Sequence, residues 1–492
     1  MRICFLFDTR AFAIPEARYA VRNLALLMGL PARLAPAGSP LGDEEIPVRV
    51  GAPAGTGEAA AVLPVGTWEV WDSAAVRLAA FEGVPLPCPE GRFPQPCSPA
   101  EFPEPWLRAV AWLLTREEEQ SETRRDEWEC FAGSFSRQHE LGILDAPLVN
   151  RYADQLHRRI AIWCARHDRR PDPLPRWKDG ARFAVVLSHD VDDIRCYSWA
   201  EVFRLLGRAR GPASYAARRS LAQALRLLRR GPAQGDPYWQ FEKWMGAETR
   251  HGFRSTFYVF PPEPSPVHEF DPTYRLADRI EFEGRSMPFH RLLAEMVARG
   301  FEVGLHGGYN SFRSAAELRR EKEQVERELG APIHGLRQHY LRFDARATWS
   351  AQQEAGFLYD STLGYNEAVG FRAGIAAPFR PWHPERREPH RILELPLTVM
   401  DGVLFRTLKL DARLAERRVR EHLETVESAG GLGVLLWHPN GADARLFPGW
   451  WDSYERVLEY LGRRSAWVPT GAELAQWWTA REARVLVPSP DG

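Results

Sequence analysis

The stretch Phe183-Ala184-Val185-Val186-Leu187-Ser188-His189-Asp190-Val191-Asp192-Asp193 carries the strongest indication of the fold. Its first five residues are apolar, which is typical of a buried parallel strand. The imidazole and three carboxylates at its end are costly to bury unless they bind a cation or transfer protons. Because active sites in α/β folds lie at the carboxyl ends of the strands, this stretch predicts an active site there.

The same arrangement occurs twice more along the chain. Residues 301–305 form an apolar run that leads into His306, and residues 433–437 form one that leads into His438. Three predicted strands therefore each carry a metal-binding or proton-binding side chain at the same end. This pattern indicates an enzyme with a metal-assisted active site.

The composition is that of a globular protein with more than one domain. The chain has 492 residues, of which 45% are apolar, and length alone suggests two to three domains. A formal net charge of -1 argues against a nucleic-acid partner. No cysteine forms a Cys-x-x-Cys pair, so a zinc knuckle is unsupported; the cysteines are Cys4, Cys88, Cys97, Cys130, Cys164 and Cys196. No apolar run at the start is long enough for a signal peptide or a membrane span, so we expect a cytoplasmic protein.

Two regions differ in their sequence pattern. Residues 1–175 contain an early strand and helix followed by segments rich in Pro, Gly and Ala, which indicates a smaller α/β accessory domain of unknown role. Residues 181–480 alternate short apolar strands with helices, which predicts parallel βαβ units closing into a barrel or near-barrel. The predicted strands are 183–187, 255–260, 301–305, 333–337, 392–397, 433–437 and 466–469.

An arginine-rich insertion at about 200–235 interrupts this alternation. Between Val202 and Gly235 there is no acidic residue, whereas eight arginines alternate with leucines at near-helical spacing. One interpretation is a solvated amphipathic helical pair that covers the barrel. The other is a cationic lid that recruits an anionic glycan or a membrane surface, and its position after the Asp-bearing strand places it beside the site.

Five segments occur in the order of the motifs of a known family. They are Ser188-His189-Asp190-Val191-Asp192 for Thr-Phe-Asp-Asp, 255–258 for Ala-Thr-Phe-Phe, 301–310 for Glu-Ile-Gly-x-His-x-x-x-His, 337–340 for Arg-x-Pro-Tyr and 436–438 for Leu-x-His. The set resembles the polysaccharide deacetylases of carbohydrate esterase family four, which have the NodB-homology fold. The resemblance covers residues 181–480 and implies a deformed (β/α) barrel, preceded here by an accessory domain.

By this resemblance, Asp190 is the general base and Asp192 is a ligand of a divalent metal ion, with zinc expected. Alternate residues of a strand point to opposite faces, so the one-residue spacing allows both carboxylates to share a side. Asp193 would then point away and cap a helix. A divalent metal lowers the pKa of bound water, which is what hydrolysis of an N-acetyl group requires.

The second and third metal ligands differ in how well the sequence supports them. His306 matches the first histidine of the family motif and follows a strand, so we expect it to be a ligand. The second histidine of the motif is replaced by Asn310, which is expected to bind through its amide oxygen. Water or His189 are alternatives, and His339, in place of a proline of the family, is also able to point inward.

The remaining catalytic roles also follow from the resemblance. Arg337 is expected to orient the base, the backbone amide of Tyr340 to bind the oxyanion, and His438 to protonate the leaving amine. A carboxylate should orient His438, and either Asp360 or Asp401 is available. Asp360 fits the order of the motifs better.

The sequence therefore predicts a metal-dependent hydrolase that removes N-acetyl or related acyl groups from a carbohydrate. Without a leader segment, a cytoplasmic sugar precursor or a lipid-linked glycan is the expected substrate. One alternative is a hydrolase of ureides or cyclic amides with the same fold. The other is a catalytically silent glycan-binding protein, in which the missing histidine reflects a lost metal.

Overall fold

The structure is a computed structural model that describes residues 1–51, 58–95, 98–229, 235–261 and 267–487. Cys97 and Arg230, the last of the eight arginines counted between Val202 and Gly235, lie outside these ranges. Within the described ranges, no helix combines the length and apolar character needed to cross a bilayer.

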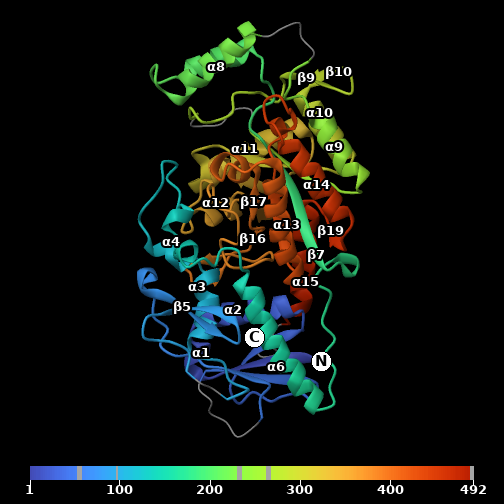
Figure 1. Ribbon diagram of the computed structural model, residues 1–492. Coiled ribbons are helices and arrows are strands. Elements are labelled where there is room, and N and C mark those ends of the chain that lie inside the picture. The colour runs from blue at the N-terminus through green and yellow to red at the C-terminus, as the bar shows by residue number, and fades with distance from the viewer. Residues whose placement is uncertain (52–57, 96–97, 230–234, 262–266, 488–492) are drawn as a thin grey trace.

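A curled parallel sheet forms the centre of the second region (Figure 1). In the described part of the chain it has nine strands in the order β16-β13-β12-β11-β8-β7-β18-β17, with β19 paired to the start of β7. The strands are β7 (Phe183–Val191), β8 (Thr256–Val259), β11 (Glu302–Gly307), β12 (Gly335–Gln338), β13 (Tyr359–Asp360), β16 (Leu393–Glu394), β17 (Val399–Met400), β18 (Leu432–Leu436) and β19 (Ala466–Trp467).

Strand β7 is the central strand, and all nine of its residues are buried. One edge pairs with β18, while on the other edge its first residues pair with β19 and its last residues with β8. Burial on both faces explains why the strand begins as a continuous apolar run. The strand predicted at 183–187 is confirmed and extends to Val191, so Asp190 lies inside the sheet.

The sheet curls so far that the strands at its two ends, β16 and β17, are consecutive in the chain. Strands β16 and β17 are joined by residues 395–398, yet β16 pairs with β13 and β17 pairs with β18. The seam between them contains Pro396, which has no N–H to donate to a neighbouring strand. This arrangement is a deformed (β/α) barrel, as predicted.

Helices surround the sheet and follow the predicted alternation (Figure 1). In α11, the side chain of Ser314 accepts a hydrogen bond from the amide of Glu317, and Gly330 ends the helix at φ 71°. The apolar residues Leu318, Val325 and Leu329 of this helix are buried. The helices are α9 (Phe241–Arg250), α10 (Phe289–Ala298), α11 (Ala315–Leu329), α12 (Thr348–Glu354), α13 (Ala412–Ser428), α14 (Trp450–Gly462) and α15 (Gly471–Val485).

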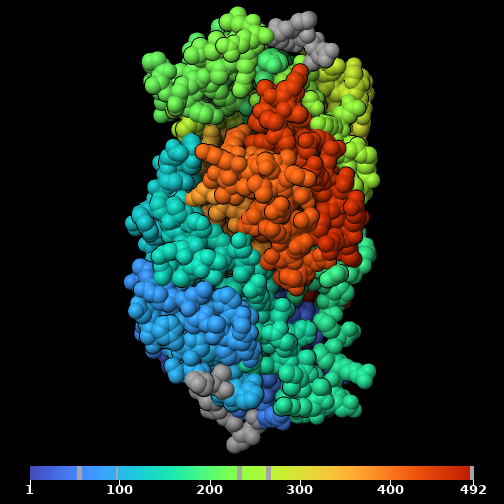
Figure 2. All heavy atoms as spheres, in the orientation of Figure 1, coloured from blue at the N-terminus to red at the C-terminus, as the bar shows by residue number. Residues whose placement is uncertain are grey.

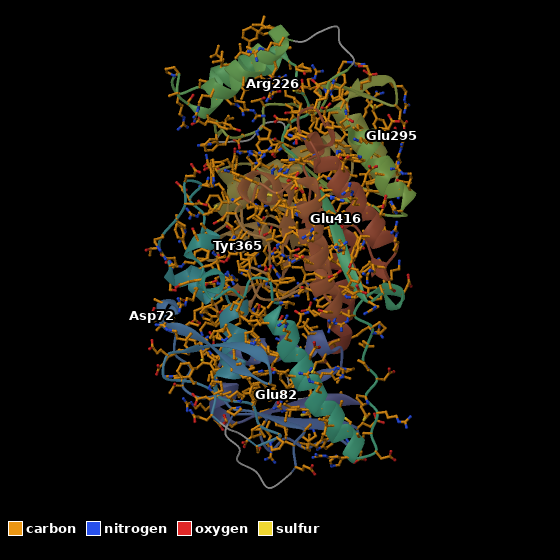
Figure 3. All side chains as sticks on the ribbon, in the orientation of Figure 1. Asp72, Glu82, Arg226, Glu295, Tyr365 and Glu416 are labelled. Carbon is orange, nitrogen blue, oxygen red and sulfur yellow. The ribbon has the colours of Figure 1, made fainter. Side chains whose placement is uncertain are left out.

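The arginine-rich insertion forms a helical hairpin of α7 (Trp199–Arg208) and α8 (Tyr215–Arg229) directly after β7. The hydroxyl of Ser220 in α8 donates to the carbonyl of Val202 in α7 at 2.9 Å. The hairpin lies at the end of the molecule opposite the N-terminal residues, as Figure 1 shows, and Arg226 marks α8 in Figure 3. Two short antiparallel strands, β9 (Arg279–Phe282) and β10 (Arg285–Pro288), lie near it.

The N-terminal region contains a separate parallel sheet in the order β2-β1-β3-β4 and an antiparallel pair β5-β6. The division into domains at 1–175 and 181–480 stays a prediction. The strands are β1 (Arg2–Phe7), β2 (Ala32–Pro36), β3 (Glu45–Val50), β4 (Ala61–Leu63), β5 (Val76–Phe81) and β6 (Val84–Pro89). The helices are α1 (Thr9–Phe12), α2 (Pro15–Met28), α3 (Pro105–Leu114), α4 (Glu117–Ser121), α5 (Arg137–Glu140) and α6 (Leu148–Arg166).

A buried ion network joins the N-terminal region to the barrel, whose surfaces are continuous in Figure 2. Arg372 binds both carboxylate oxygens of Glu119 at 2.8 Å, and Arg116 binds the same carboxylate at 2.6 Å. All three side chains are at most 3% exposed. Burial raises the pKa of Glu119, but the two guanidinium groups lower it to about 2, so the carboxylate stays charged.

We predict that Arg372→Met destabilises the protein by about 3–5 kcal/mol, because it removes one partner of a buried pair. The matched control is Arg387, which is half exposed. It pairs with Glu16 at 2.7 Å across the same junction. Arg387→Met should cost no more than about 1 kcal/mol, the usual value of a surface pair. Urea unfolding measures both changes, and equal losses would show that the buried network has no special role in stability.

Candidate metal centre and active site

The end of β7 places its polar side chains on two sides of the sheet. Ser188 and Asp190 both accept a hydrogen bond from Nη1 of Arg337 at 2.9 Å, so they share one side. His189 points the other way, where Nδ1 contacts the carbonyl of Trp437 at 2.7 Å and Nε2 contacts Glu248 at 2.8 Å. The strand alternation predicted for this segment is therefore present, and His189 is not available as a metal ligand.

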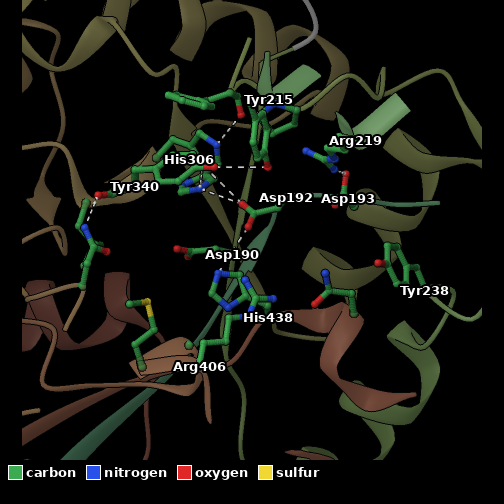
Figure 4. Close-up of a pocket in the computed structure, with 18 of the residues that line it drawn as sticks. Asp190, Asp192, Asp193, Tyr215, Arg219, Tyr238, His306, Tyr340, Arg406 and His438 are labelled. Carbon is green, nitrogen blue, oxygen red and sulfur yellow. Dashed lines mark hydrogen bonds and ion pairs between the residues drawn. The ribbon is translucent and has the colours of Figure 1, made fainter. Parts of the chain in front are cut away.

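Asp192, His306 and His339 form a cluster at the carboxyl ends of β7, β11 and β12 (Figure 4). Their potential ligand atoms all lie within 4.8 Å of one another. Nε2 of His306 lies 3.3 Å from Oδ1 of Asp192 and 2.9 Å from Nδ1 of His339. One carboxylate and two imidazoles are a common donor set for a zinc site with an open position.

The hydrogen bonds of the two rings show which nitrogens are free to bind a metal. Nδ1 of His306 donates to the carbonyl of Arg337, and Nε2 of His339 donates to the carbonyl of Phe270, both at 2.9 Å. In neutral rings, Nε2 of His306 and Nδ1 of His339 then carry lone pairs, and these atoms face each other. Such carbonyl acceptors are typical outer-shell partners of metal-binding histidines.

The charges of the cluster also fit a cation. Oδ1 of Asp192 is buried and has no hydrogen bond of good geometry within the described chain. Burial raises the pKa of Asp192, but His306, His438 and His339 lower it well below its ordinary value. Burial lowers the pKa of His339 to about 4, so its ring is neutral at pH 7. A carboxylate and two facing lone pairs together suit a cation, and a divalent metal ion is able to bind all three.

Asn310, the expected third ligand, is engaged elsewhere. Its Oδ1 accepts a hydrogen bond from Nη1 of Arg342 at 3.1 Å. His339 supplies the third donor instead, from the turn that follows β12. The alternative in which His339 points inward is thus the one that the geometry favours over Asn310.

Asp190 is fixed next to this cluster by Arg337. Nη1 of Arg337 lies 2.9 Å from Oδ1 of Asp190, and both side chains are buried. Nε and Nη2 of the same guanidinium donate to the carbonyl and hydroxyl of Ser361 at 2.8 and 2.9 Å. Burial lowers the pKa of Arg337, but the charge of Asp190 raises it above its ordinary value, so the guanidinium stays charged.

His438 is oriented by Asp401 and not by Asp360, which corrects the preference drawn from motif order. Nδ1 of His438 lies 2.7 Å from Oδ1 of Asp401, and Nε2 lies 3.5 Å from Oδ2 of Asp192. Asp360 instead accepts a hydrogen bond from the hydroxyl of Thr362 at 2.5 Å. Asp360 lies in β13, and its buried neighbour Glu394 lies in β16. In the strand order these two strands are at the opposite end of the sheet from β18, which precedes His438.

Tyr340 lies beside the cluster in a strained backbone conformation. Its φ of 57° and the φ of 51° at Leu341 are in the left-handed region, which costs about 1–3 kcal/mol per residue and is often found at functional sites. The ring of Trp128, from the N-terminal region, stacks on Tyr340 with centroids 4.6 Å apart. Sequence analysis did not single out Trp128, because no motif precedes it.

A cavity of about 510 Å³ is lined by Asp190, Asp192, His306, His339 and His438. Figure 4 shows the first three of these and His438 close together. The walls of the cavity come from three parts of the chain: Trp128 from the N-terminal region, Tyr215, Arg219 and Arg226 from α8, and Arg406 and Asn440 from the barrel. Residues of the insertion therefore line the same cavity as the Asp192/His306/His339 cluster.

Comparison with known proteins gives similarity only at the level of solved structures. No family model and no curated protein matches the chain. A putative polysaccharide deacetylase from Mycobacterium smegmatis is 19% identical over 63% of this chain and 94% of its own, with a TM-score of 0.42. Puue allantoinase is 15% identical over 64% of this chain and 96% of its own, with a TM-score of 0.41. A carbohydrate esterase family four pseudoenzyme from Bacillus anthracis is 10% identical over 59% of this chain and 65% of its own, with a TM-score of 0.27.

These matches concern the fold alone. The strand order described above defines the barrel independently of the matches. The roles of individual residues rest on the geometry of the cavity.

The donor set predicts the outcome of two substitutions. His339→Ala should weaken Zn²⁺ binding at least about tenfold, because it removes one of three donors. Asn310→Ala should leave the affinity within about twofold, since its amide oxygen is hydrogen-bonded to Arg342. Calorimetric titration of the metal-free protein measures both. The reverse order of effects would restore Asn310 as the ligand.

Proposed function

We propose that this protein is a metal-dependent hydrolase that removes an N-acetyl or related acyl group from a carbohydrate. The observation that carries the proposal is that three sets of groups meet at one cavity. Asp192, His306 and His339 line it as a donor set, Asp190 lines it with Arg337 behind it, and His438 lines it with Asp401 behind it. Hydrolysis of an amide needs a Lewis acid, a base and an acid, and each set matches one of these needs.

Asp192, His306 and His339 would hold the metal, with zinc expected from the donor types. A bound divalent ion supplies an activated water and polarises the acyl carbonyl. Asp190 accepts the proton of the attacking water, since the hydrogen bond from Arg337 fixes the orientation of its carboxylate. The backbone amide of Tyr340 is proposed as a donor to the oxyanion.

His438 delivers the proton to the departing amine. Burial lowers the pKa of His438, but the charge of Asp401 and its hydrogen bond raise it to about 9. The ring is therefore protonated near neutral pH, as a general acid must be. Asp401 binds Nδ1, which leaves Nε2 directed toward the cavity.

The walls of the cavity suggest the class of substrate. Trp128 and Tyr340 form a stacked aromatic surface, which suits the apolar face of a sugar ring. Arg226 and Arg406 line the same cavity, so an acylated sugar that carries an anionic group fits better than a neutral one. A volume of about 510 Å³ is in the usual range for small ligands. The cytoplasmic location expected from the sequence stays a prediction.

The three donors weaken the catalytically silent alternative, which was motivated by the loss of the second histidine of the motif. His339 restores the number of donors from a different strand end. The ureide alternative shares the metal and the base, so substrates must separate it. N-acetylated sugars, sugar phosphates and ureides form the necessary panel.

We predict acetate release from N-acetylated sugars that chelators abolish and Zn²⁺ restores. Asp190→Asn should lower kcat by about 100-fold or more while leaving the metal content unchanged, because a base is lost and no ligand is. Acetate assays with metal analysis test both parts. Hydrolysis of ureides alone would reject the proposed substrate, and near-normal kcat in Asp190→Asn would reject the base.

The corrected partner of His438 gives a second prediction. Asp401→Asn should lower kcat by about 100-fold and shift the basic limb of the pH–rate profile to lower pH, since the pKa of His438 falls when it loses the charge of Asp401. Asp360→Asn is the matched control, being buried and acidic but hydrogen-bonded to Thr362. If Asp360→Asn shifts the profile and Asp401→Asn does not, Asp360 is the orienting residue.

A further inference from the structure

The surface of the α7–α8 hairpin that faces away from the barrel is apolar. Six large apolar side chains on it are between 41% and 73% exposed. They are Trp199, Phe203 and Leu206 of α7 and Leu221, Leu225 and Leu228 of α8. In each helix the spacing is i, i+4, i+7, so each set forms one stripe along its helix.

The opposite faces of the two helices hold the hairpin on the barrel. Arg204 and Arg208 of α7 bind Asp278 and the carbonyl of Asp271, and Arg219 of α8 forms an ion pair with Asp193. Residues two positions apart lie roughly 200° apart around a helix, so these arginines are opposite Leu206 and Leu221. Both stripes therefore point away from the barrel.

The positive charge of the hairpin indicates which kind of partner contacts this apolar surface. Arg210, Arg218 and Arg229 are exposed, and no acidic residue occurs between Val202 and Gly235. An exposed apolar stripe with Trp, Phe and Leu, bordered by arginines, is the pattern of a helix that lies in the interface of an anionic membrane. A soluble helix pair that merely covers the barrel would present polar side chains here.

We propose that the α7–α8 hairpin docks the protein on an anionic bilayer, with its six apolar side chains in the interfacial layer and its exposed arginines on lipid headgroups. The position of the hairpin permits this, because it forms the end of the molecule farthest from the N-terminal residues (Figures 1 and 2). This inference stands apart from the chemistry of the cavity.

Docking has a consequence for the substrate that does rest on the proposed function. The cavity is lined by Tyr215, Arg219 and Arg226 of α8. Docking of the hairpin therefore brings the mouth of the cavity to the level of the headgroups. Arg226 and Arg406 then face the position of a lipid phosphate. The substrate class is an N-acylated sugar that is linked through phosphate to a membrane lipid.

Vesicle sedimentation tests the docking with the full-length protein. Wild type should bind phosphatidylcholine vesicles that contain phosphatidylglycerol, and binding should weaken as salt screens the arginines. The pair Leu221→Ser and Leu225→Ser should weaken binding by about 100-fold. The pair Arg218→Gln and Arg229→Gln should weaken it by about fivefold per arginine and flatten the salt dependence.

The control pair is Leu41→Ser and Leu414→Ser, at positions 45% and 42% exposed in the N-terminal region and α13. It should bind vesicles as wild type does. Matching circular dichroism and melting curves exclude misfolding as the cause of a loss. The proposal is overturned if wild type does not bind, or if the leucine pair binds equally well. It is also overturned if sedimentation without vesicles shows a dimer that the leucine pair dissociates, since a second copy then covers the surface.

An activity comparison separates docking from chemistry. In the Leu221→Ser and Leu225→Ser double variant, the rate of hydrolysis of an N-acetylated glycolipid in vesicles should fall by the same factor as vesicle binding. The rate of hydrolysis of the free sugar phosphate should equal that of wild type. Equal rates of the pair and of wild type on the glycolipid would overturn the substrate inference. Failure of wild type on both substrates, with vesicle binding intact, would count against the proposed function and leave the docking standing.

Discussion

One buried guanidinium organises the centre of this protein. Arg337 is fully buried, and a charge in such a position is stable only when its partners surround it. Its side chain binds Ser188 and Asp190 of β7 and Ser361 after β13, so it ties the central strand to strands further round the sheet. Its own carbonyl accepts the hydrogen bond of His306. The proposed base Asp190, the proposed metal ligand His306 and the packing of the barrel thus all depend on Arg337.

The sequence predicted those features that the geometry of a single strand determines. The pleat of β7 makes Ser188 and Asp190 share a side, and the apolar run before His306 marks the end of β11. The barrel itself followed from the alternation of strands and helices. Each of these is a local regularity, so spacing alone was sufficient.

The sequence did not predict contacts that depend on which loops meet. Motif order favoured Asp360 and Asn310, whereas the structure pairs His438 with Asp401 and brings His339 to the metal cluster. Both outcomes depend on turns after strand ends, one of them with the positive φ of Tyr340. Trp128 was missed for the same reason, since it reaches the cavity from a region distant in sequence.

The seam between β16 and β17 has a consequence for what keeps the barrel closed. The Asp192/His306/His339 cluster lies at the carboxyl ends of β7, β11 and β12, in the continuous part of the sheet, whereas Asp401 follows β17 at the seam and His438 follows β18 beside it. At the seam, the covalent chain around Pro396 completes the ring, and within the described residues no ladder of hydrogen bonds joins β16 to β17. Packing takes the place of the ladder there, because Leu395, Leu397 and Thr398 of the joining segment are each at most 3% exposed.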